Sequence, residues 1–188
     1  VAYVGSYSYT GKAKGITIYD VDTQKGCFVK KDEVDVDNSS YVIKSRNQKT
    51  LYSIADEGIV SFRILPDGGL ERLNSVKING MRGCHLSTDI NDKFIFVSGY
   101  HDGKITVLKL HPDGRVGKIV DEVYHKGLGS IAERNFRPHV SCTRTTPDGH
   151  FVMAADLGID QVKIYHFDNN DERLALVDMI PCDINSAP

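Results

Sequence analysis

The chain has 188 residues, of which 40% are hydrophobic, and its formal net charge at pH 7 is −2. Lys and Arg are scattered and form no basic stripe, which excludes a nucleic-acid partner held through its phosphates. The purely apolar runs are far shorter than the ~20 residues that a membrane-spanning helix needs. We therefore expect a globular protein with no nucleic-acid and no membrane partner.

The four cysteines argue against a metal centre. Cys27, Cys84, Cys142 and Cys182 lie far apart and show no C-x-x-C spacing. Widely spaced cysteines of this kind are typical of reduced thiols in a cytoplasmic protein. We expect a cytoplasmic protein that needs no metal and no other cofactor.

Short runs of β-branched and aromatic residues, separated by turn residues, predict strands throughout. Taken in chain order, the expected strands are Ala2–Ser6, Gly15–Val21 and Cys27–Val36; then Tyr41–Ser45, Leu51–Ala55, Ile59–Ile64 and Leu70–Ile78; then His85–Thr88, Phe94–Ser98, Lys104–Leu110 and Gly117–Tyr124; and last His139–Arg144, Phe151–Ala155, Gln161–Phe167 and Arg173–Ile180. The sequence thus repeats one four-strand unit, whose strands we call a to d from the inside outward.

The repeat length identifies the architecture. From Leu51 to Phe94 the interval is 43 residues, close to the ~40–45 of one blade of a β-propeller. From Phe94 to Phe151 it is 57 residues, so the last interval carries a polar insert. We predict an all-β fold, a β-propeller of about four blades of four antiparallel strands. The blades are expected at 1–36 (lacking its inner strand), 39–78, 84–124 and 139–183, with the insert at 125–138.

Tight-turn signals divide the two faces of this disc. Pro66-Asp67-Gly68 and Pro112-Asp113-Gly114 join strands c and d, and Pro147-Asp148-Gly149 joins strands a and b. Because strands alternate in direction, a–b and c–d turns share one face, which these plain turns mark as inert. The b–c and d–a connections share the other face.

That other face collects the polar candidates for chemistry. The residues expected there are Tyr100, His101, Asp156, His85, Glu133, Arg134, Arg137 and His139. A loop lengthened at one place in a repeat usually serves binding rather than folding. The remaining histidines, His111, His125, His150 and His166, are expected in turns or on solvent faces.

A propeller ring normally closes, which removes the free edges of its sheets. This chain begins at a strand b and stops at Pro188, where the next strand a would begin. We expect it to be the first part of a larger protein; the alternative is a closed four-bladed ring, whose first blade would lack an inner strand. Exposed blade edges would then favour self-association of these 188 residues alone.

Several segments resemble the propeller-type lactonase family, which includes bacterial 6-phosphogluconolactonase and fungal carboxymuconate cyclase. The matching segments are Tyr3-Val4-Gly5-Ser6-Tyr7, Leu73-Asn74-Ser75-Val76 with Cys84-His85-Leu86-Ser87, Ser98-Gly99-Tyr100-His101-Asp102-Gly103, Ala132-Glu133-Arg134 with Arg137-Pro138-His139-Val140, and Ala155-Asp156-Leu157-Gly158-Ile159-Asp160. They stand in the family's order across nearly the whole chain. The resemblance implies a seven-bladed propeller of which this chain is the N-terminal part.

Two departures limit what the resemblance implies about activity. The family usually has a second His two residues after the Pro-His, where this chain has Ser141. The Arg and Glu that join the family's pocket from the next blade would lie beyond Pro188. We therefore expect catalysis from the full-length protein, as a lactonase, and not from these 188 residues alone.

Lactone hydrolysis needs a base to activate water, a donor for the oxyanion and, for a phosphorylated sugar, cations for the phosphate. We assign His139 as base or proton shuttle and Glu133 as its orienter or the alternative base. Arg134 and Arg137 would hold the anion. His85, His101, Tyr100 and Asp156 are secondary candidates for substrate binding. A polar pore lining is an adequate explanation for His85 and His101, and for Asp156 a turn cap is favoured over catalysis.

Two other functional classes fit the same residues. A cyclase acting on a dicarboxylate such as carboxymuconate would use the arginines for carboxylates and the His or Glu to move a proton to carbon. A non-enzymatic propeller would instead bind a partner through exposed aromatic residues, for which Tyr7, Tyr9 and Tyr100 are available. The polar cluster favours a small anionic ligand.

Overall fold

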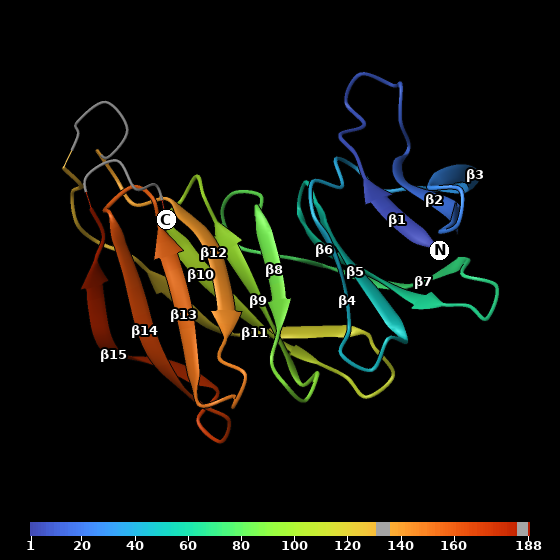
Figure 1. Cartoon of the computed structure of the whole chain (residues 1–188). Helices are drawn as coiled ribbons and strands as arrows, with labels where there is room; N and C mark the ends of the chain where they lie inside the picture. The colour runs from blue at the N-terminus through green and yellow to red at the C-terminus, as the bar shows by residue number, and fades with distance from the viewer. Residues whose placement is uncertain (131–135, 184–187) are drawn as a thin grey trace.

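A computed structural model describes residues 1–130, 136–183 and 188 of the chain. In this part the chain forms antiparallel sheets and no helix, so it contains no helix that could span a membrane. Four sheets stand side by side along an arc, with the N-terminus at the first sheet (Figure 1). This confirms the prediction of an all-β propeller fold.

Each sheet is a meander of consecutive strands. The first sheet has three strands, β1 (Ala2–Gly5), β2 (Gly15–Asp22) and β3 (Cys27–Asp35). The second comprises β4 (Val42–Lys44), β5 (Thr50–Ala55), β6 (Gly58–Ile64) and β7 (Leu70–Lys77); the third β8 (His85–Thr88), β9 (Phe94–Gly99), β10 (Lys104–Leu110) and β11 (Val116–Tyr124); and the fourth β12 (Val140–Thr145), β13 (Phe151–Asp156), β14 (Gln161–Asp168) and β15 (Arg173–Pro181). Every strand end lies within one residue of its expected position.

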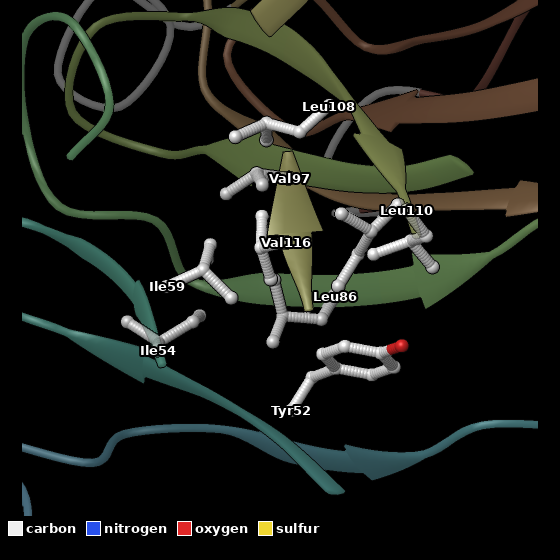
Figure 2. Close-up of a cluster of buried hydrophobic side chains, with 9 residues drawn as sticks. Tyr52, Ile54, Ile59, Leu86, Val97, Leu108, Leu110 and Val116 are labelled. Carbon is white, nitrogen blue, oxygen red and sulfur yellow. The ribbon is translucent and has the colours of Figure 1, made fainter. Parts of the chain in front are cut away.

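Apolar clusters fill the space between neighbouring sheets. Tyr52, Ile54 and Ile59 of the second sheet pack against Leu86 and Val97 of the third, and all five are at most 1% exposed (Figure 2). Similar clusters join the first sheet to the second and the third to the fourth. Because both faces of the second and third sheets are covered, the middle strands of these two sheets are almost continuously buried.

The predicted tight turns form as their residues require. Gly68, Gly114 and Gly149 have φ values of +84°, +90° and +75°. The N–H of each donates to a carbonyl three residues earlier, at 2.8–2.9 Å. Positive φ is a conformation that glycine adopts without steric cost, so these turns fix the strand pairings on either side.

The inner strands β4, β8 and β12 line the concave side of the arc and run in the same direction. Ser87 Oγ donates to the Thr143 carbonyl at 2.6 Å, and Thr145 Oγ1 donates to the Thr88 carbonyl at 3.3 Å. We call the end at which these strands begin the start face and the end at which they finish the end face. The 125–138 insert leads into the start face, just before β12.

Candidate active site on the start face

His139 is held at the point where the insert meets β12. Its backbone N–H donates to Asp156 Oδ1 at 2.7 Å, and its ring stacks on Tyr100 with centroids 4.3 Å apart and an interplanar angle of 19°. The Phe136 ring meets the His139 ring edge-on, with centroids 6.1 Å apart. The side chain is only 4% exposed, so the imidazole has a fixed orientation.

The hydrogen bonds of His139 define its tautomer. Its Nδ1 lies 2.6 Å from the carbonyl oxygen of Tyr100, and a carbonyl oxygen can only accept. Nδ1 must therefore carry a hydrogen. In the neutral ring, Nε2 is then an acceptor, and it forms no hydrogen bond with any of the described residues. This is the proton-accepting atom that a general base requires.

Asp156 lies behind His139 and is completely buried. Its Oδ1 accepts from the N–H groups of His139 and Gly158, at 2.7 and 2.9 Å, and its Oδ2 faces His125 Nδ1 at 2.7 Å. Both carboxylate oxygens of Asp156 are thus engaged in hydrogen bonds within the protein. Asp156 positions the start of β12 instead of contacting a ligand, which agrees with its alternative interpretation as a turn cap.

His125 is the residue that the sequence prediction misplaced. It was expected in a turn or on a solvent face, but it is 6% exposed and lies between Asp156 and Tyr165. The Tyr165 hydroxyl is 2.9 Å from His125 Nε2, and burial together with the charge of Asp156 raises the pKa of Tyr165 to about 12. The hydroxyl therefore stays protonated and can donate. The Asp156–His125–Tyr165 chain links three segments that are distant in sequence, which spacing alone does not predict.

Three further predicted residues lie on the start face near His139. Tyr100 is half-buried beneath the His139 ring, and His101 is exposed and meets Tyr100 edge-on at 5.5 Å. Arg137 is exposed, with its guanidinium 5.3 Å from the centroid of the Phe136 ring. It has no carboxylate partner among the described residues, so its charge is available to an anion. Glu133 and Arg134 lie outside the described residues.

His85 is on the same face but is buried within the hub. Its ring packs against Tyr41 at 4.8 Å, its Nδ1 lies 3.5 Å from the Thr143 N–H, and its Nε2 lies 3.5 Å from Cys142 Sγ. Burial, with a smaller effect from the charge of Arg144, lowers the pKa of His85 to about 4. His85 is thus neutral at pH 7, and both of its ring nitrogens contact β12, the inner strand of the next sheet.

Arg82 is a start-face residue that the sequence did not single out. Its guanidinium pairs with Asp56 at 2.8 Å and lies 5.0 Å from the centroid of the Tyr7 ring. Asn38 holds Asp56 from the other side at 2.8 Å. The contact joins loops of three sheets, and nothing in the local sequence around Arg82 signals it.

Cysteine thiols and clusters of metal-ligating side chains are two other common sources of chemistry in a site. All four cysteines are free, and burial raises the pKa of Cys84 to about 11, so it is a protonated thiol at neutral pH. Residues 1–130 and 136–183 contain no group of three or more metal-ligating side chains. The described arrangement offers an oriented imidazole with a free Nε2 beside an exposed guanidinium. It suits proton abstraction from water next to a bound anion.

Comparison with known proteins agrees with this geometry. The family model described as "Lactonase, 7-bladed beta-propeller" matches residues 1–188. The 6-phosphogluconolactonase of Bacillus subtilis is 34% identical over 171 residues, which cover 88% of this chain and 48% of that protein. The chain therefore spans about half the length of the curated relatives it matches.

Solved structures show the same arrangement of sheets. A candidate 6-phosphogluconolactonase of Bacteroides fragilis superposes with a TM-score of 0.89 at 31% identity, over 99% of this chain and 55% of that one. A periplasmic gluconolactonase of Pseudomonas aeruginosa superposes with a TM-score of 0.90 at 25% identity, over 99% of this chain and 56% of that one.

Proposed function

Because this chain belongs to the seven-bladed β-propeller lactonase family, we propose that the protein of which it forms part or all hydrolyses a sugar lactone, with 6-phosphogluconolactone as the substrate. His139 Nε2 takes a proton from water, which attacks the lactone carbonyl. Arg137 holds the anionic end of the substrate, and Arg134 and Glu133 complete the site. The observation that carries the proposal is the hydrogen bond from His139 Nδ1 to the Tyr100 carbonyl, which leaves Nε2 as the acceptor.

The phosphate group distinguishes 6-phosphogluconolactone from neutral sugar lactones. An arginine matches phosphate through two parallel N–H donors, whereas a neutral sugar lactone offers no anion to bind. Among the relatives, one is a 6-phosphogluconolactonase and one a gluconolactonase. The guanidinium of Arg137 is exposed and has no ion-pair partner in residues 1–130 and 136–183, which favours the phosphorylated substrate.

The test is a rate measurement on the intact protein, with the spontaneous hydrolysis rate subtracted. Hydrolysis of 6-phosphogluconolactone and of gluconolactone is followed beside lactonisation of carboxymuconate. We expect His139→Ala to lower kcat for 6-phosphogluconolactone by more than about a hundredfold. We expect Arg137→Gln to raise KM for that substrate and to leave gluconolactone hydrolysis unchanged.

His150→Ala is the matched control, because His150 is an exposed histidine of the same sheet beside an end-face turn. Its rates should equal those of the wild type. Unchanged rates in His139→Ala would remove the imidazole from the mechanism. Turnover of carboxymuconate alone would replace the hydrolase with the cyclase, in which the same arginine holds a carboxylate.

A further inference from the structure

The end face of the hub, expected to be inert, contains a cavity of about 350 Å³. It lies where β4, β8 and β12 finish, on the side opposite His139. Its lining includes the cations Lys44, Arg46 and Arg144 and contains no acidic residue. A cavity of this size falls within the range of small-molecule sites.

The three cations are free to bind a ligand. None of Lys44, Arg46 and Arg144 forms an ion pair or a side-chain hydrogen bond with any residue in the described part of the chain. All three are exposed to the cavity and solvent. Three like charges around one concavity repel one another and create a positive potential, which a bound anion would offset.

A carboxylate that contacts two of the lining residues, Arg46 and Thr88, is already engaged in hydrogen bonds. Asp92 accepts from the backbone N–H groups of Arg46 and Asn47, at 2.9 and 3.0 Å, and from the Thr88 hydroxyl at 3.0 Å. It therefore fixes the backbone that carries Arg46 and leaves the guanidinium free. The Ser87 and Thr145 hydroxyls tie the third sheet to the fourth, so the wall of the cavity is braced across sheets.

The charge of Arg144 also acts on the hub, since it adds to burial in lowering the pKa of His85.

We propose that the end-face cavity is a second anion site, which binds a phosphate group through Lys44, Arg46 and Arg144. Forked guanidinium donors from two different sheets suit the tetrahedral phosphate dianion, and the lysine adds a point charge. The site is separate from the proposed active site, since the two occupy opposite ends of the inner strands. The phosphate is either free or carried by a small metabolite.

Calorimetric titration of the intact protein with sodium phosphate at low ionic strength tests the proposal. It is carried out in the Arg137→Gln background, which weakens phosphate binding at the start face. We expect saturable binding that Arg46→Gln and Arg144→Gln each weaken at least tenfold. Arg173→Gln, the same charge change at an exposed arginine of β15, should alter the affinity less than twofold.

Two results would overturn the proposal: no saturable binding in this background, or affinities that Arg46→Gln and Arg144→Gln leave unchanged. Titration with 6-phosphogluconate and with gluconate then distinguishes the sources of the phosphate. Tighter binding of 6-phosphogluconate than of inorganic phosphate supports a metabolite. Equal affinities support free phosphate, and in either case gluconate should not compete.

Discussion

Asp156 is predicted to be the residue on which the geometry of the start face depends most. Its carboxylate is fully buried and accepts from three donors, the N–H groups of His139 and Gly158 and the ring of His125. Leaving a buried donor without its acceptor costs about 1–3 kcal/mol. Asp156→Ala leaves all three donors without an acceptor and should lower the free energy of unfolding by about 4 kcal/mol. This is a large part of the stability of an ordinary domain.

Asp156→Asn is the milder variant and keeps the prediction testable if the alanine protein does not fold. The amide oxygen can still accept from the two backbone N–H groups, but the amide nitrogen now faces the donor on His125 Nδ1. His125 can switch tautomer only by reversing its hydrogen bond with Tyr165. We expect a loss of about 2 kcal/mol from the missing charge-assisted bonds.

The measurement is urea unfolding of the intact protein, followed by far-ultraviolet circular dichroism. Asp171→Asn is the matched control, because Asp171 is exposed and its carboxylate accepts no hydrogen bond from a described residue. It should change the unfolding free energy by less than about 0.5 kcal/mol. If Asp156→Asn matched this control, Asp156 would not hold the site together and the reasoning would be wrong.

Three further predictions concern the hub and its surroundings. Burial lowers the pKa of His85 to about 4, so between pH 6.5 and 4 the unfolded state binds a proton more readily than the folded state. The free energy of unfolding should be complete above pH 6.5 and fall by on the order of 3 kcal/mol as the pH drops through that window. His85→Gln should flatten this slope, and an unchanged slope would refute the prediction. Lys104→Gln breaks the ion pair with Glu122, in which the lysine side chain is 1% exposed. Thermal and urea unfolding should show that the free energy of unfolding falls by about 2–3 kcal/mol. A loss below about 0.5 kcal/mol would show that the pair is not buried in solution. In Gly158→Ala the added Cβ would lie 2.0 Å from the backbone carbonyl oxygen of Arg137, so the chain beside His139 must shift. Lactone hydrolysis should fall more than about tenfold, and the free energy of unfolding should fall by about 1–3 kcal/mol. Wild-type rates would contradict the close approach.

The strands of this fold could be predicted because their signals are local. Phe94-Ile95-Phe96-Val97 and the alternating segment that begins at Lys104 form β9 and β10 as expected, and glycine at positive φ closes the turns between strands. Strand period and turn chemistry depend on residues a few positions apart. A four-strand repeat then determines the order of the sheets.

The candidate site was predictable only in part, because its contacts connect different sheets. His139 was identified from its neighbours in sequence, and the structure places it on Tyr100, 39 residues earlier. His125 and Tyr165 meet across 40 residues, and no local pattern predicts that pairing. The cation-lined cavity of the end face was missed for the same reason, since Arg46 follows β4 of the second sheet and Arg144 lies in β12 of the fourth.

A crystal structure of the intact protein with 6-phosphogluconate bound would test the central claim most directly. The product carboxylate is the group that the attacking water creates, so it should lie within hydrogen-bonding distance of His139 Nε2, with the phosphate towards Arg137. Product bound at the start face with its carboxylate away from His139, or a site formed without this imidazole, would contradict the account.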